Sequence, residues 1–318
     1  MTSGAQGAAG SEPRAAGDVT QAVVLGAGLG TRLRPMTEHL PKPGVPLLHI
    51  PVAAHAIAHL AAAGVRDVAV NTHYLASALE AALPAHVPPH VTLRFSREAA
   101  LLGTGGGIRA AWALLDRTRP LLVMNGDILF RPDLAEVVRV HRTRAALATM
   151  VVRAHPEAQR LGAVESDRQG RVVRLLGTPA EREVAEEWMF TGVHVLSPEV
   201  FGRLPEEGCI VRRGYRHWVD EGLPVYAAPS DATFRDVGTH AEYLAAHLDA
   251  LDADPSTVAV HPDARVMPEA HLSRSFVGPH AEVASGVRLH ECVVWPGTTV
   301  RSSATRALIG PFGVLPVP

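Results

Sequence analysis

Residues 21–35 have the sequence QAVVLGAGLGTRLRP, and this stretch decides the fold. The apolar, β-branched run at 21–25 predicts a buried strand, and the glycines at 26, 28 and 30 predict a loop at its carboxyl end. Backbone N–H groups in such a loop bind phosphate, and glycine lets a ligand approach the chain closely. The stretch therefore indicates an α/β protein with an anion site beyond its first strand.

Strands and helices alternate downstream of this loop. We predict strands at 65–71, 91–95, 121–124 and 146–152, and helices at 51–63, 74–83, 108–115, 132–141 and 242–251. This alternation predicts a Rossmann-like, mostly parallel sheet with helices on both faces, whose ligands bind beyond the carboxyl ends of the strands. Residues 163–195 are antiparallel in character and predict an inserted sheet that closes one side of a pocket.

After residue 255 the sequence changes to a short apolar repeat. Apolar residues recur every five or six positions, with Gly and Pro between them, at Val260, Val266, Leu272, Val277, Val283, Leu289, Val294 and Val300. This period is typical of a left-handed parallel β-helix, with about 18 residues in each coil, and irregular strands of a small β domain are the alternative. We predict a disordered tail at 1–18, a main α/β domain at 19–252 and the β-helix at 255–318.

Composition excludes several classes of function. The 318 residues include 30 basic and 32 acidic side chains, so no basic surface for nucleic acid is expected. No apolar run approaches the roughly 18 residues that cross a membrane, and residues 1–18 lack the apolar core of a signal peptide. The two cysteines have no metal or redox spacing. We therefore expect a cytoplasmic protein that binds neither nucleic acid nor membranes.

Lys42 is the only lysine, and the other 29 basic residues are arginines. A single lysine in such a chain indicates a site where a compact ammonium is needed and a planar guanidinium does not fit. Pro41 and Pro43 stiffen the segment that carries it. Chance survival of one lysine is the alternative, and the position of Lys42 ten residues after Arg32 argues against it.

Two common phosphate motifs do not match the glycine loop. A dinucleotide-binding fingerprint needs a third glycine where this chain has Thr31, and an acidic residue near 46–50, where there is none. A Walker loop needs a lysine directly after its glycines, whereas Lys42 is distant. A polyphosphate held by the loop, Arg32 and Lys42 remains as the interpretation.

Six motifs resemble those of the sugar-1-phosphate nucleotidyltransferases and occur in that family's order. They are the segment GAGLGTRLRP at 26–35, PKP at 41–43, LGTGGGI at 102–108, NGD at 125–127, TG at 191–192 and DVGT at 236–239. The resemblance extends over about residues 21–245, and hexapeptide repeats also follow the catalytic domain in several branches of the family. It implies that a sugar 1-phosphate and a nucleoside triphosphate give an NDP-sugar and pyrophosphate.

The resemblance also implies roles for individual residues. Arg32 and Lys42 would be catalytic, and Asp127 and Asp236 would hold Mg²⁺, although Asp127 could instead cap a helix. The sugar would contact Asn125, Gly162, Thr191 and Gly192. The nucleotide would contact Gly28, Leu29, Gly30, Thr31, Gly103, Thr104, Gly105 and Gly106, with the glycines at 103–107 forming a loop against the base. Asn71, His73 and Glu98 fall near the same edge, and for His73 a structural role is the stronger interpretation.

The chain departs from the family pattern at two places. Many members have a Glu-Lys-Pro segment whose lysine binds the sugar phosphate, and the corresponding segment here is LLGTP at 175–179. Arg174 or Arg182 would have to replace that lysine. Ala27 also stands where many members have glycine. The repeats favour a mannose-1-phosphate guanylyltransferase or a glucose-1-phosphate enzyme, whereas the triple glycine and the missing lysine favour an N-acetylmuramate-1-phosphate uridylyltransferase.

Two other functions are open. A regulatory subunit that senses nucleotide sugars would share the fold, but such proteins commonly lose the residues that are present here at 32, 42, 127 and 236. A cytidylyltransferase for phosphocholine would need an aromatic pocket, and only 5% of the residues are aromatic. Because the open edge of a β-helix invites pairing, we also predict a homo-oligomer.

Overall fold

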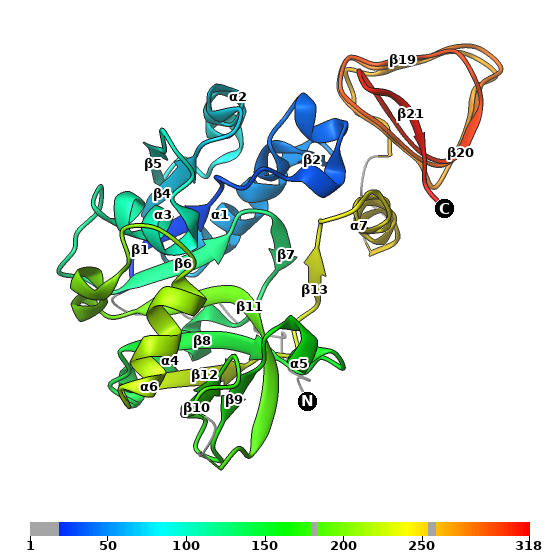
Figure 1. The fold of residues 1–318 in the computed structure, drawn as a ribbon. Helices are drawn as coiled ribbons and strands as arrows, with labels where there is room; N and C mark the ends of the chain where they lie inside the picture. Colours follow the sequence, from blue (N-terminus) through cyan, green and yellow to red (C-terminus); the bar gives the residue numbers. More distant parts are fainter. Residues whose placement is uncertain (1–18, 180–182, 254–258) are drawn as a thin grey trace, which may run out of the picture.

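The computed structural model describes residues 19–179, 183–253 and 259–318 (Figure 1). The predicted tail at 1–18 and the predicted domain boundary at 252–255 lie wholly or partly outside the described residues. Within the part of the chain that the structure describes, no helix is long and apolar enough to cross a membrane.

The centre of the main sheet is parallel, as predicted. Strand β1 (Gln21–Leu25) lies between β4 (Asp67–Thr72) and β6 (Leu121–Asn125), and β5 (Thr92–Arg97) pairs with the outer side of β4. All three pairings are parallel. The glycine loop after β1 and the segment after β6 therefore begin at the same edge of the sheet.

An antiparallel part extends the sheet beyond β6. Strand β11 (Glu186–Leu196) pairs antiparallel with β6, with β8 (Ala148–Arg153) and with β9 (Val164–Ser166), and β9 pairs with β10 (Val172–Leu175). These strands confirm the inserted antiparallel sheet. Strand β12 (Val225–Pro229) pairs with β8. Because β6 and β8 are both antiparallel to β11, they run in the same direction and end at the same edge.

Helices cover both faces of the sheet because its buried strands alternate between two cores. In β1, Ala22 and Val24 belong to the core under α1 (Val52–Ala62), α2 (Ala76–Ala82) and α4 (Leu134–Thr143). Val23, between them, belongs to the core under α3 (Gly103–Trp112) and α6 (Arg216–Asp220). A period of two in a strand that is apolar throughout accounts for this two-sided burial.

The prediction that 103–107 form a loop is wrong, because α3 begins at Gly103. The glycines here make room for the chain's own backbone. A Cβ on Gly105 would lie 2.5 Å from Pro205 Cγ, and a Cβ on Gly106 would collide with the carbonyl oxygen of Glu206. The first turns of α3 can therefore pack tightly against the segment at 205–208.

The repeats after residue 259 form stacked coils, which Figure 1 shows as a triangular winding. Val266 in β14 (Arg265–Val266) pairs in parallel with Val283 in β17 (Glu282–Val283), which pairs with Val300 in β19 (Thr299–Val300). The spacing is thus 17 residues rather than 18. A second ladder joins β15 (His271–Ser273), β16 (Phe276–Val277), β18 (Arg288–Val294) and β20 (Ala304–Gly310).

The last strand, β21 (Gly313–Pro316), folds back antiparallel onto β20. It covers one edge of the coils with the chain's own C-terminal segment. The oligomer prediction rests on an open edge of the coils, and β21 reduces that edge. Among the described strands, β19 pairs only with β17, so its outer edge is open.

The coils and helix α7 (His240–Ala253) pack against the segment at 31–47, which carries the catalytic candidates Arg32 and Lys42. Helix α7 lies next to the coils (Figure 1). Tyr243 on α7 donates a hydrogen bond from Oη to the carbonyl of Pro46 (2.5 Å) and accepts one from Trp295 Nε1 (3.0 Å). Leu33, Met36 and Val45 share one apolar core with the coils.

The remaining elements are short. Helices of the 3₁₀ type occur at Thr31–Leu33, Met36–Glu38, Lys42–Gly44, Pro84–His86 and Pro198–Arg203, a π-helix occurs at Val211–Tyr215, and α5 is Ala158–Leu161. Two short two-stranded sheets pair β2 (Pro46–Leu47) with β3 (Ile50–Pro51), and β7 (Ile128–Phe130) with β13 (Phe234–Asp236). The second of these brings Asp236 next to the segment that follows β6.

Candidate active site

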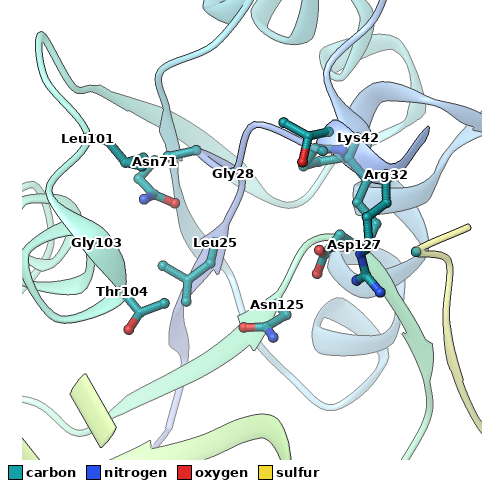
Figure 2. Close-up of a pocket in the computed structure, with 15 residues that line it drawn as sticks. Leu25, Gly28, Arg32, Lys42, Asn71, Leu101, Gly103, Thr104, Asn125 and Asp127 are labelled. Carbon is teal, nitrogen blue, oxygen red and sulfur yellow. Dashed lines mark hydrogen bonds and ion pairs between the residues drawn. The ribbon is translucent and has the colours of Figure 1, made fainter. Parts of the chain in front are cut away.

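A cavity of about 370 Å³, the first cavity, opens at the carboxyl edge of the parallel strands. Figure 2 shows Arg32 and Asp127 on one side of it, Gly103 and Thr104 on the other, and Leu25 and Asn125 between them. Its lining comes from six segments: Leu25, Ala27, Gly28, Gly30, Thr31 and Arg32; Lys42 and Pro43; Asn71; Leu101, Gly103 and Thr104; Asn125 and Asp127; and Gly238.

The three glycines of the loop have different reasons to be glycine. A Cβ on Gly26 would lie 2.9 Å from the carbonyl oxygen of Asn71, and Gly30 has φ +60° with Lys42 Cβ 2.9 Å from its missing Cβ. Glycine is required at those two positions by the protein's own packing and backbone conformation. Gly28 has nothing within 4 Å of its missing Cβ and faces the first cavity. Its missing side chain leaves space for a ligand.

Asn71 and Glu98 brace the walls of the first cavity. Asn71 Oδ1 accepts a hydrogen bond from the backbone N–H of Gly26 (2.8 Å), and Asn71 Nδ2 donates to Glu98 Oε1 (2.7 Å). Glu98 Oε2 accepts from the N–H of Leu102, directly before α3 (2.9 Å). His73 Nδ1 pairs with the backbone carbonyl of Glu98 (2.9 Å), in agreement with a structural role. This chain of bonds fixes the glycine loop relative to α3.

Lys42 lies between the two aspartates that were predicted to hold a metal. Its Nζ donates to Asp127 Oδ2 and to Asp236 Oδ1, both at 2.8 Å. Arg32 Nη2 donates to the other oxygen of Asp236 at 3.3 Å. Asp127 therefore does not cap a helix; the capping aspartate of α4 is Asp133.

The Lys42 side chain is 8% exposed, whereas those of Asp127 and Asp236 are 34% and 37% exposed. Burial acts to lower the pKa of Lys42, but the charges and hydrogen bonds of the two aspartates outweigh it and raise the pKa above its usual value. Lys42 is consequently an ammonium at neutral pH, fixed in place by two carboxylates.

A second cavity, of about 710 Å³, adjoins the first and shares Leu25, Arg32, Lys42, Thr104, Asn125 and Asp127 with it. Its own walls come from the antiparallel part of the fold. They are Ile128, Arg153, His155, Glu157, Arg160, Leu161, Met189, Phe190, Thr191, Gly192, His194, Cys209, Ile210, Val211, Phe234, Arg235, Asp236 and Glu242. Lys42 and Asp127 thus lie where the two cavities meet.

Most of the predicted site residues line one cavity or the other. Four do not: Leu29, Gly105, Gly106 and Gly162. Gly105 and Gly106 lie inside α3, and Gly162, at φ +91°, ends α5 beside the second cavity. Thr191 lines the second cavity, but its hydroxyl donates to the carbonyl of Val151 (2.8 Å). Gly192 leaves the space that the side chain of Asn125 fills.

Neither arginine that was expected to replace the missing lysine is available in the described structure. Arg174 pairs with the buried Glu165 through Nε and Nη2, at 2.5 and 2.6 Å, and does not line either cavity. Arg182 lies outside the described residues. Arg153, which lines the second cavity, was missed by the sequence reasoning. It directly follows a predicted strand, so the rule that ligands bind at strand ends could have found it.

The aspartate pair has the donor set that a magnesium ion uses. Two carboxylates from different elements converge on one point beside two cavities, and Mg²⁺ in proteins is commonly held by one or two carboxylates together with phosphate oxygens and water. No cluster of three or more His, Cys, Asp or Glu side chains occurs among the residues at 19–179, 183–253 and 259–318. The residues fit an ion that is brought in with a phosphate ligand.

Comparisons with known proteins agree with this geometry. Residues 21–253 match the family described as nucleotidyl transferase. The mannose-1-phosphate guanylyltransferase of Mycobacterium tuberculosis is 30% identical over 88% of this chain and 81% of its own length. The UTP–glucose-1-phosphate uridylyltransferase of Synechocystis is 29% identical over 89% and 82%. The chain therefore belongs to the nucleotidyl transferase family and is a sugar-1-phosphate nucleotidyltransferase.

Proposed function

We propose that the protein joins mannose 1-phosphate to GTP, giving GDP-mannose and pyrophosphate. The observation that carries the proposal is the position of Lys42, held between Asp127 and Asp236 where two cavities meet. A nucleotide and a sugar phosphate need two compartments, and the transferred phosphorus must lie at their junction. A charged lysine and two carboxylates at this junction fit phosphoryl chemistry.

The reaction needs alignment and charge neutralisation rather than a covalent intermediate. An oxygen of the sugar phosphate attacks the α-phosphorus of the triphosphate and forms a new P–O bond. The bond from the α-phosphorus to the β-phosphate oxygen breaks, and pyrophosphate leaves with the electron pair. In this proposal Lys42 neutralises charge on the α-phosphate and the incoming sugar phosphate, and Arg32 holds the β- and γ-phosphates.

The two cavities divide the substrates between them. The backbone of the glycine loop and the start of α3 would hold the nucleotide in the first cavity. Asn125 and the backbone at Gly192 would contact the sugar in the second cavity, together with the end of α5 next to Gly162. Leu29 is 43% exposed and borders the loop, where it could cover one side of the nucleotide.

Magnesium is the metal we propose for the two aspartates. Bound there, Mg²⁺ would neutralise phosphate charge and orient the triphosphate. Asp127 and Asp236 would hold it, and Lys42 keeps these two like charges together. This role requires no further protein ligand, in agreement with the two-carboxylate set.

The names of the relatives support the choice of substrates. A relative at 30% identity acts on mannose 1-phosphate and GTP by its name, and one at 29% acts on UTP and glucose 1-phosphate. The second pair is our alternative.

We further infer that the protein has a catalytic domain at 19–252, that the stacked coils are a left-handed β-helix, and that it acts in the cytoplasm as a homo-oligomer. A concentration-independent monomer mass in light scattering would contradict the oligomer.

The direct test is pyrophosphate release with Mg²⁺ across five nucleoside triphosphates and a panel of sugar 1-phosphates that includes mannose, glucose and N-acetylmuramate. We expect release with GTP and mannose 1-phosphate above every other pair. A signal confined to UTP and glucose or N-acetylmuramate 1-phosphate would replace the proposed substrates. Folded protein that releases no pyrophosphate with any pair would favour a non-catalytic sensor.

A further inference from the structure

The second cavity contains one arginine without a carboxylate partner among the described residues. Arg160 pairs with Glu157 at 2.7 Å, and Arg235 pairs with Asp249. The guanidinium of Arg153 makes no ion pair and no hydrogen bond to any residue in the described ranges, although it lines the same cavity. Its five N–H donors are therefore free to bind an anion.

The position of Arg153 is fixed by an aromatic ring. Its guanidinium lies over Phe234, with Cζ 5.5 Å from the ring centroid. Phe234 in turn contacts Phe130 edge-on, with the centroids 5.4 Å apart, and lies two residues before Asp236 on β13. Stacking holds one face of the guanidinium and leaves its edge, where the N–H donors are, for a ligand.

Arg153 also lies at the correct edge of the sheet. It is the last residue of β8, which runs in the same direction as β6 and ends on the side where Asp127 follows β6. Arg153, Lys42 and Asp236 line one cavity. An anion held by Arg153 would therefore lie in the compartment that faces the aspartate pair.

We propose that Arg153 binds the phosphate of the sugar 1-phosphate and takes the place of the lysine that this chain lacks. The inference rests on the proposed function. The planar fork of arginine matches two phosphate oxygens at once, which a lysine cannot do, and this fixes the orientation of the attacking oxygen as well as its charge. Phosphate binding by Arg153 explains how a chain with a single lysine can hold two phosphate groups.

The test is the substrate dependence of Arg153→Met, since methionine retains an apolar side chain against Phe234. We expect the KM for the sugar 1-phosphate to rise by about 10- to 100-fold, the loss expected for a charge-assisted pair, and the KM for the nucleoside triphosphate to change less than about twofold. Arg153→Lys should recover part of the loss. Arg144→Met is the matched control, because Arg144 stacks on Tyr226 in the same way, at 5.6 Å, and lines neither cavity.

An unchanged KM for the sugar 1-phosphate in Arg153→Met, or an equal rise in both KM values, would overturn the inference while leaving the proposed function intact. If the wild-type protein has no activity with any pair, calorimetry with mannose 1-phosphate decides separately. Binding by the wild type that is lost in Arg153→Met supports the phosphate site without the transferase. No binding by the wild type, or equal binding by both proteins, contradicts it.

Discussion

The first and second cavities share six lining residues but differ in how they are built. Four of the fifteen residues that line the first cavity are glycines, which present only backbone to a ligand, and its strands are parallel neighbours. The second is made mainly of side chains from β8, α5, β11 and β13, which are distant in sequence. Backbone recognition suits the phosphates that all nucleotides share, whereas side chains can change with the sugar.

The difference explains where this chain departs from the family pattern. In the family pattern the missing lysine binds the sugar phosphate, which we propose to lie in the second cavity, where its proposed replacement, Arg153, also lies. The first cavity retains its motif except at Ala27, and its walls are fixed by the bonds between Asn71, Glu98 and Gly26. Changes on the side of the second cavity should therefore alter substrate choice, while changes at the shared boundary should stop the reaction.

The largest effect is expected at that boundary. Lys42→Met removes the charge between Asp127 and Asp236, and kcat should fall by about 10²- to 10³-fold, as for the loss of a preorganised electrostatic contact. Lys42→Arg should not restore the rate, because a planar guanidinium cannot place one compact charge between two carboxylates as the ammonium does. Steady-state pyrophosphate release measures both variants.

Asp127→Asn should cause a similar loss, with Asp231→Asn as the control for an exposed carboxylate that lines neither cavity. Circular dichroism must show that each variant is folded. Full activity of Lys42→Arg would contradict the need for a compact ammonium, and full activity of Asp127→Asn would contradict the aspartate pair.

A matched pair of glycine substitutions tests the backbone character of the first cavity. Gly28→Ala adds a methyl group where no protein atom lies within 4 Å, so the stability should be unchanged and the KM for the triphosphate should rise about tenfold if the ligand occupies that space. Gly26→Ala places a methyl group 2.9 Å from a carbonyl oxygen and should lower the free energy of unfolding by about 1–3 kcal/mol.

Urea denaturation and substrate titration separate these two effects. A destabilised Gly28→Ala protein with normal affinity for the triphosphate would mean that the chain itself requires glycine there. That result would remove the argument that the open space at Gly28 belongs to the ligand.

A smaller effect is expected on the pH dependence of stability. It concerns His194, a buried residue that lines the second cavity and contacts Tyr215. Burial lowers the pKa of His194 to about 3 from an ordinary 6.5. A histidine with a depressed folded pKa contributes full stability above pH 6.5 and loses it as the pH falls toward 3, because only the unfolded chain takes up the proton. Its contribution falls by about 2 kcal/mol between pH 7 and pH 5.

His194→Asn removes this group. Between pH 7 and pH 5, the free energy of unfolding measured by urea denaturation should fall by about 2 kcal/mol less in the variant than in the wild type. Burial also lowers the pKa values of His55, His141 and His247, so both proteins should retain the pH dependence that these three residues cause. An identical pH dependence in both proteins would mean that His194 is not held neutral by burial.

The sequence predicts the first cavity better than the second for a physical reason. The loop at 26–31 and Asp127 follow the ends of strands whose parallel order follows from the alternation of strands and helices. Gly105 and Gly106 could not be assigned correctly, because the segment at 205–208 that packs on them is a hundred residues away. The positive charge of Arg174 would suit a phosphate, but only the folded structure shows that this arginine is paired with Glu165.

The coils show the same limit on the scale of a domain. The period of five or six residues predicts stacked strands, and the pairing of Val266 with Val283 and Val300 follows it. No repeat could show that β21 returns to cover β20, or that Trp295 donates a hydrogen bond to Tyr243 on α7. Those contacts depend on packing between distant parts of the chain.

A crystal structure of the protein with GDP-mannose and Mg²⁺ tests the two-cavity account most directly. We expect the base beside Gly103 and Thr104, the two phosphates of GDP-mannose at Lys42, the metal between Asp127 and Asp236, and the sugar between Asn125 and Gly192. A nucleotide in the second cavity, or phosphates that do not reach Lys42, would contradict it.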